Sequence, residues 1–507
     1  MKITIFSKIV NIYLFIMFLF FSLIVSNKDY ANILEVRYYS FIFLTFSFFI
    51  ILIVAYFYQL FINEKNFFSK YKLNLFQKLG LLYLLVNILA TVFSPYKSYD
   101  LMTGLGRGEG LLLTSLYVLV YLAIITFGKF NKKMLTLIST SSIIICFICG
   151  LQFWGLNPFY MLKGIAGPYN VSYMGTIGNI AFLSAIITIT LPVSICSYIF
   201  LKNSPLEKVI FLLSVFLSMF IMEVIDVDSG MVAVLFMFAV ILPLVLKNNK
   251  IFANFLFALG ILIASFFLNY FVNMTYFSDL AIYKANPQFN CLSLLILVSI
   301  TLIIGISFLV KKKNFTVKNY TKLTIRIYIS YVILGILLIV GLYLFDFNMR
   351  ILSQVHNILR GNLDDNFGTY RIFLWKRSLI LFTDYPILGT GPDTFALRFM
   401  PNYWQELIKL DGYLSINDTA ANIYLTTLIN IGIVGLISYI LLISYPIIKY
   451  VKANNEYSLV LLIGVLCYTV QGFFNLSVII VSPYFWMTLG ILALSFEVLS
   501  NKEKERV

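Results

Sequence analysis

Charged side chains that could carry chemistry gather in one stretch of the chain, residues 346–420, called here the hydrophilic loop. It holds seven basic residues, eight acidic residues and His356, the single histidine of the sequence. Histidine exchanges a proton near neutral pH more readily than any other unperturbed side chain. The hydrophilic loop is therefore the first candidate for acid–base chemistry.

A glycine-rich turn, GTGPDTF, occupies residues 389–395 of the hydrophilic loop. Gly389 and Gly391 permit a tight backbone turn, and Pro392 suits the first position of a helix. Backbone N–H groups in such a turn can bind phosphate or an oxyanion. Because the same sequence also occurs in turns that bind nothing, both interpretations stay open.

A second polar motif, GRGEG at residues 106–110, precedes an apolar run. Arg107 could bind an anion there. The alternative is an arginine that anchors the helix end at the membrane interface, with Glu109 stabilised by the positive end of the helix dipole. The segment GPYNVSYMGTIGN, residues 167–179, offers a similar choice between a ligand at a helix N-terminus and ordinary capping by Asn179.

The elements that carry these motifs must lie in a membrane. Hydrophobic residues make up 61% of the 507-residue chain and charged residues 12%, and the mean hydropathy is +0.92. This composition leaves too little polar surface to enclose a water-soluble core. We therefore predict an all-α polytopic membrane protein.

Apolar runs of roughly twenty residues recur along the whole chain, each long enough to cross the bilayer as a helix. They predict about fourteen spans. Residues 1–345 then form spans 1–11, residues 346–420 the external loop, and residues 421–507 spans 12–14 with a cytoplasmic tail. The predicted spans are 9–26, 39–62, 79–96, 108–127, 134–153, 177–200, 209–225, 231–246, 251–272, 290–310, 327–345, 421–448, 458–475 and 482–499.

The distribution of Lys and Arg predicts the orientation, because basic residues accumulate on the cytoplasmic side. With the N-terminus inside, the internal segments hold 24 of the 37 basic residues and the short external loops hold six. The remaining seven lie in the hydrophilic loop, which is too long for the rule to weigh heavily. Both termini are predicted to be cytoplasmic and the hydrophilic loop extracytoplasmic, in a multi-pass protein of the cell membrane.

The hydrophilic loop is predicted to be structured rather than to be a linker. Its pattern indicates helices at about 348–360 and 370–383, a break at Tyr385 and Pro386, and a short helix after GTGPDTF. The second helix is rich in apolar and aromatic residues and carries Arg371, Lys376 and Arg377. It suits a helix lying in the membrane interface, and an interfacial helix without a catalytic role is the alternative.

In their order along the chain, these segments resemble the superfamily of bacterial O-antigen ligases and O-antigen polymerases. The strongest resemblance is NILRGNLDDNFGTYRIFLWKRSLILFTDYPILGTGPDTF at residues 357–395, with its Gly-x-x-Arg, Trp-Lys and Pro-x-x-Gly-x-Gly elements. GRGEG at 106–110, GTIGN at 175–179 and AANIYLTTLINIGIVGLISYI at 420–440 resemble other segments of the family.

This resemblance implies transfer of a glycan from undecaprenyl diphosphate to an acceptor, with inversion at the sugar carbon and without a metal or other cofactor. A diphosphate leaving group needs charge stabilisation, which guanidinium groups supply. Arg371 and Arg107 are the first candidates for that role. The substrate path is predicted to include Arg360, Lys376, Arg377, Gly389, Gly391, Arg398 and Asn422.

The sequence departs from the family pattern at the predicted base. Family members commonly have His-Asn at the start of the span after the loop, whereas this chain has Ala421 and Asn422. An arginine often found near the start of the eighth span also has no counterpart in DVDSGM, residues 226–231. His356 could replace the missing base, with Asp393 or Asp418 as carboxylate alternatives.

The resulting hypothesis is a glycan ligase or polymerase. Its partners would be a lipid-linked oligosaccharide donor, a glycan or protein acceptor, and the lipid bilayer. The net charge of +15 is dispersed along membrane flanks, so no nucleic acid partner is expected. Two rival hypotheses are a transporter of lipid-linked glycans and a member that binds the carrier but has lost its chemistry.

Overall fold

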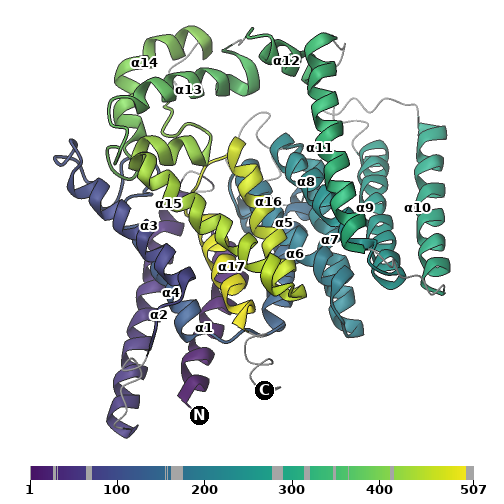
Figure 1. The fold of residues 1–507 in the computed structure, drawn as a ribbon, viewed down its shortest axis with the longest axis horizontal. Coiled ribbons are helices and arrows are strands. Elements are labelled where there is room, and N and C mark those ends of the chain that lie inside the picture. Colours follow the sequence, from purple (N-terminus) through teal and green to yellow (C-terminus); the bar gives the residue numbers. More distant parts are fainter. Residues whose placement is uncertain are drawn as a thin grey trace.

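The computed structural model describes residues 2–26, 30, 32–63, 71–154, 156, 158–161, 175–276, 289–312, 320–345, 350–362, 365–411 and 416–497. All secondary structure within these residues is helical (Figure 1). The all-α architecture predicted from the hydropathy pattern is confirmed for this part of the chain.

The helices follow one another along the chain, and most are long enough to cross a bilayer. Their bounds are α1 (Lys2–Leu19), η1 (Phe21–Leu23), α2 (Ile33–Asn63), α3 (Leu75–Val92), α4 (Leu111–Phe127), α5 (Lys133–Phe153), η2 (Pro158–Tyr160), α6 (Ile180–Phe200), α7 (Pro205–Ile225), α8 (Asp228–Val245), α9 (Asn249–Tyr276), α10 (Phe289–Lys312), α11 (Tyr320–Leu344), α12 (Arg350–Leu359), α13 (Phe367–Phe382), α14 (Phe395–Asp411), α15 (Ile423–Ala453), α16 (Glu456–Gln471), η4 (Gly472–Phe474) and α17 (Ser482–Ser495).

Within the described residues, 11 helices are long and apolar enough to cross a membrane. The three further predicted spans correspond to α4, α10 and α17. The helices α4 and α17 have 17 and 14 residues, and Leu302–Lys311 is the apolar segment of α10 among the described residues. The protein is therefore a multi-pass membrane protein, and the count of fourteen spans stays a prediction.

The hydrophilic loop folds into three helices, α12, α13 and α14. They lie across one end of the bundle, and α1 begins at the opposite end (Figure 1). We call the covered end the loop end. The predicted helices at 348–360 and 370–383 correspond to α12 and α13, and the helix after GTGPDTF is α14, which has 17 residues.

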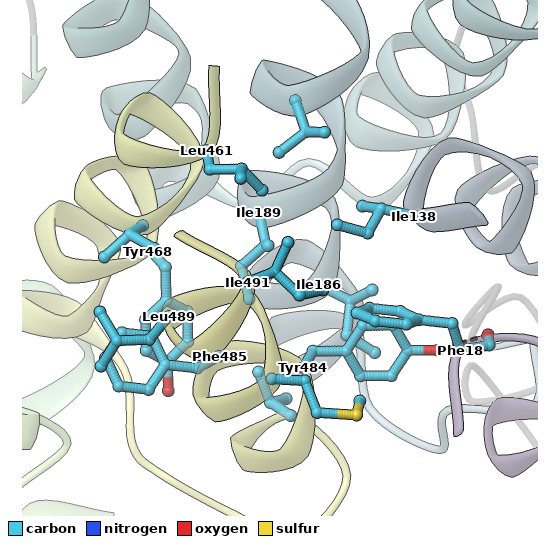
Figure 2. Packing of buried hydrophobic residues seen from close by; sticks show 14 of the residues in the cluster. Phe18, Ile138, Ile186, Ile189, Leu461, Tyr468, Tyr484, Phe485, Leu489 and Ile491 are labelled. Carbon is cyan, nitrogen blue, oxygen red and sulfur yellow. Dashed lines mark hydrogen bonds between the residues drawn. The ribbon is translucent and has the colours of Figure 1, made fainter. Parts of the chain in front are cut away.

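The centre of the bundle is α6, where 89% of the membrane-spanning window is buried. Ile186 and Ile189 of α6 pack near Tyr484 and Phe485 of α17 in the apolar core (Figure 2). Tyr484 donates a hydrogen bond to the carbonyl oxygen of Phe18 at 3.2 Å, which ties α17 to α1. The core thus holds helices from both ends of the chain together.

Hydroxyl groups join the core helices to one another. Ser142 of α5 lies 2.8 Å from Ser218 of α7, and Thr190 of α6 donates to Ser142 at 2.9 Å. Lipid offers these groups no partner, so interhelical hydrogen bonds stabilise the packing. This buried network explains how a rigid frame forms beneath the loop end.

Candidate functional site

The hydrophilic loop docks on a break in a membrane helix. In α15, Ile431 has φ −126° and Gly432 has φ 67°, so the helical hydrogen bonds are interrupted there. The N–H groups of Thr390 and Gly391 donate to the carbonyl oxygen of Asn430 at 3.0 and 2.7 Å. Irregular backbone is tolerated at membrane depth only where protein satisfies it.

The glycine turn fits this break because it lacks a side chain at the contact. A Cβ added to Gly389, whose φ is +65°, would lie 2.4 Å from the Asn430 carbonyl oxygen. Further along α15, the N–H of Ile433 donates to the carbonyl oxygen of Pro386 at 2.8 Å. Two backbone N–H groups of the glycine-rich turn, which the sequence suggested could bind phosphate, therefore donate to a carbonyl oxygen of α15.

Two motifs that are far apart in sequence meet at Asp393. Its Oδ2 accepts hydrogen bonds from the backbone N–H groups of Gly106 and Arg107 at 2.9 and 3.1 Å. A Cβ on Gly104 would lie 2.5 Å from the same oxygen. Glycine at this position therefore lets the 104–110 loop close over the carboxylate, and Asp393 is only 6% exposed.

Arg107 is held between the hydrophilic loop and α6. Its Nε donates to Asp418 Oδ2 at 2.8 Å, and its guanidinium carbon lies 5.7 Å from the centroid of the Phe182 ring. Phe182 follows Asn179, whose side chain caps α6 by accepting from the N–H of Ala181 at 2.8 Å. Capping, one of the two alternatives for this segment, is thus what the Asn179 side chain does.

Arg107 and Asp393 line a pocket between the loop end and the membrane helices. Its wall includes Arg107, Glu109, Asp393, Asn430 and Trp486. The elements that supply the wall are α3, α4, α15, α17 and the two polar turns. Glu109 accepts a hydrogen bond from the Tyr117 hydroxyl at 3.0 Å, whereas the buried Asn430 Oδ1 has no partner among the described residues.

The two carboxyl groups of the pocket bind protons more tightly than free carboxyl groups. Burial, followed by the charge of Asp393, raises the pKa of Glu109 to about 8, against the lowering effect of Tyr117 and Arg107. Burial also raises the pKa of Asp393 to about 6, even though backbone N–H groups lower it. Perturbed carboxyl groups in a pocket are common at sites of proton transfer.

The matched family brings these observations together. Residues 291–440 match the family model described as O-Antigen ligase. Over these residues the chain is similar to the O-antigen ligase superfamily. The matched segment contains the hydrophilic loop and the first part of α15, and so includes Asp393, Asp418 and Asn430. No curated protein matches the chain. The family performs glycan transfer of the O-antigen ligase kind, and the resemblance predicted from sequence is confirmed.

Arg371 lies in the O-antigen ligase domain but is not among the residues that line the pocket. Its Nη1 donates to the carbonyl oxygen of Gly368 at 2.8 Å and its Nη2 to that of Phe474 at 3.1 Å. Burial lowers the pKa of its guanidinium group, while the charge of Asp228 opposes this effect. Its Nε is buried without a partner among the described residues, so Arg371 retains one unused donor.

Two predicted residues of the O-antigen ligase domain lie on α12, against the end of α11. His356 Nδ1 is 2.6 Å from the carbonyl oxygen of Leu342. The Nε of Arg360 donates to the carbonyl oxygen of Tyr343 at 3.1 Å. Neither side chain is among those that line the pocket.

The other predicted cations are paired inside the loop. Lys376 lies 2.7 Å from Asp365, and Arg377 lies 2.6 Å from Glu406. Arg398 is only 3% exposed and lies 3.0 Å from Asp384; it also donates to the carbonyl oxygen of Leu381. The structure thus gives these three cations partners within the loop and does not place them around the pocket.

Asn422 begins α15. Its side chain accepts from the N–H groups of Tyr424 and Leu425 at 2.9 and 3.0 Å, and it is 4% exposed. Ala421, at the position of the family histidine, has φ 48°. Capping fixes the helix start directly below the hydrophilic loop.

Among the pocket residues, sequence reasoning missed Glu109 and Asn430. It assigned Glu109 to the helix dipole, although a carboxyl group two residues from Arg107 in a membrane chain was a signal of function. It did not single out Asn430, a polar residue inside an apolar span before Gly432. An uncompensated amide at membrane depth is itself a reason to suspect a site.

Proposed function

We propose that this protein transfers a glycan from a lipid diphosphate to an acceptor at the outer face of the cytoplasmic membrane. The observation that carries the proposal is the pocket in which Arg107 meets the turn of the O-antigen ligase domain at Asp393. Undecaprenyl diphosphate is the proposed carrier. A surface glycan, a wall polymer or a protein is the proposed acceptor.

Arg107 suits the leaving group of this reaction. A diphosphate leaves with its negative charge already developed, so it needs stabilisation more than it needs a proton. The Nε of Arg107 is used by Asp418, and its two Nη groups make no hydrogen bond to the described residues. They are the donors we assign to the diphosphate, because a guanidinium fork matches phosphate oxygens.

The position of the pocket suits a substrate anchored in lipid. Its wall is built from membrane helices below and from polar turns above. A polyprenyl chain could therefore stay in the bilayer while its diphosphate reaches Arg107. Arg371, with its unused Nε, is proposed as a second anion ligand. We propose that no metal takes part and that the sugar carbon is inverted.

The test is glycan transfer in a strain that lacks the gene. Cells without the protein should accumulate lipid-diphosphate-linked glycan and lose the corresponding surface polymer. The unchanged gene should restore the polymer, whereas Arg107→Ala should lower transfer by about 100-fold or more, because a charge-stabilising donor is lost. Arg107→Lys should lose less, since it keeps the charge without the fork.

The matched control is Arg326→Gln. Arg326 is an exposed arginine of α11 and does not line the pocket. It should therefore leave transfer unchanged. Normal polymer levels with Arg107→Ala, at equal protein abundance in the membrane, would refute the proposed role of Arg107. A deletion strain that keeps the polymer and accumulates no lipid-linked glycan would refute the function.

A further inference from the structure

The proposed reaction needs a group that accepts a proton, and the family position cannot supply it because it is Ala421. Three other candidates are engaged elsewhere. Asp393 accepts from the backbone of the 106–107 turn, Asp418 is paired with Arg107, and His356 contacts the end of α11. A different pocket residue must therefore act on the acceptor hydroxyl.

Glu109 is the pocket carboxyl group that no hydrogen-bonded backbone turn engages, and it has a free oxygen. Its Oε1 accepts from the Tyr117 hydroxyl at 3.0 Å, and its Oε2 makes no hydrogen bond to the described residues. The side chain lines the pocket together with Arg107. The proposed inversion needs the base on the face of the sugar opposite to the diphosphate, and a sugar bound in this pocket could lie between Arg107 and Glu109.

We propose that Glu109 is the catalytic base of the transfer, an inference that rests on the proposed function. The acceptor oxygen forms a bond to the anomeric carbon while the bond from that carbon to the diphosphate oxygen breaks. The electron pair of the broken bond stays on the diphosphate. The hydroxyl proton moves to Glu109, which later releases it to water, so charge and atoms balance.

The surroundings of Glu109 tune this proton transfer. Asp393 faces it from the turn before α14 and Arg107 from its own loop. The remaining titratable neighbours are tyrosines from four spans, whose phenols are neutral near pH 7: Tyr38, Tyr83, Tyr117 and Tyr468. Because burial and Asp393 raise the pKa of Glu109 to about 8, its basic form increases as the pH rises toward and past that value.

The test compares Glu109→Gln with the unchanged chain in spheroplasts of the deletion strain. Glutamine keeps the size and the hydrogen bond from Tyr117 but cannot accept a proton. Glycan transfer should fall by at least about 100-fold. Binding of undecaprenyl diphosphate to the purified variant in detergent should remain, because Arg107 is intact. Glu109→Asp should retain part of the activity.

A second variant tests the same role without removing the carboxylate. Tyr117→Phe deletes the hydrogen bond that lowers the pKa of Glu109. The rise of transfer with pH, measured between about pH 6 and pH 9, should therefore move to higher pH. A purely structural role for Glu109 would lower the amount of folded protein and leave the profile where it is.

The matched control is Glu207→Gln. Glu207 is paired with Lys132 at 2.7 Å and caps α7, at the far end of α6 from the pocket. Glutamine preserves the capping box, so transfer should not change. Equal transfer by Glu109→Gln and by the unchanged chain would overturn the role of Glu109 and leave the proposed function intact. No transfer by the unchanged chain would overturn both.

Discussion

At the scale of residues, the carboxylates of Asp393 and Glu109 differ in the groups that surround them. The Oδ2 atom of Asp393 accepts from backbone N–H groups of the 104–110 loop, which makes it a positioning residue. Glu109 has one hydrogen bond, from a phenol, and one free oxygen. Neighbouring carboxyl groups in different environments can thus take different roles.

Asp393→Asn tests whether the two carboxyl groups are coupled. Asparagine keeps a carbonyl oxygen for the N–H groups of Gly106 and Arg107 but removes the charge that raises the pKa of Glu109. Asp393 is ionised above its own pKa of about 6, so its charge is present in the pH range where Glu109 titrates. Its removal should shift the pH profile of glycan transfer toward lower pH.

The measurement for this variant is the initial rate of transfer in spheroplasts across the same pH range. A parallel thermal unfolding curve of the purified protein controls for loss of the loop contact. A profile that stays in place, or that moves toward higher pH, would contradict electrostatic coupling between Asp393 and Glu109.

At the scale of elements, the break in α15 is the feature that joins loop to membrane. At the break in α15, hydrogen bonds to residues 386–391 replace those of one helical turn. The exchange satisfies both backbones, and apolar side chains of α13 and α14 pack beside it in one cluster with Ile429 of α15. The position of Asp393 therefore depends on Gly389 and Gly432.

Gly389→Ala should undo this docking. The added Cβ would lie 2.4 Å from the Asn430 carbonyl oxygen, and φ is +65°, so alanine is both strained and blocked. We expect a stability loss of about 1 to 3 kcal/mol and a loss of transfer, because Asp393 no longer holds the 104–110 loop. Thermal unfolding in detergent and the polymer level in cells measure the two effects.

Gly335→Ala is the matched control for this variant. A Cβ at Gly335 in α11 meets nothing within 4 Å, and alanine favours the helix. It should leave stability and transfer unchanged or slightly improved. If Gly389→Ala unfolded at the same temperature as the unchanged protein, the glycine would not be needed for docking.

The sequence was informative about elements and uninformative about their contacts. Hydropathy placed the spans because lipid imposes one length on every apolar helix, and caps such as Asn422 follow from residue type. The pairing of Asp393 with the 106–107 turn depends on packing across most of the chain, which no local pattern encodes. For the same reason the ion pairs of Arg377 and Arg398 could not be separated from ligand contacts.

At the scale of the whole molecule, the proposed function requires the loop end to face outward. The α6 helix begins beside Arg107 and spans the bundle without interruption, so α7 begins at the far end. The distribution of Lys and Arg predicts that this far end is cytoplasmic. The orientation therefore decides whether the pocket meets donors on the outer leaflet.

Single cysteines and a membrane-impermeant maleimide test that orientation. Gln405→Cys on α14 and Lys208→Cys on α7 replace exposed residues. Among the described side chains, the native cysteines are buried: Cys146, Cys149, Cys196 and Cys467. Intact cells should label Gln405→Cys at once and Lys208→Cys only after permeabilisation, while the unchanged chain sets the background. The reverse pattern would place the pocket in the cytoplasm, where an acceptor of the cell surface could not reach Glu109.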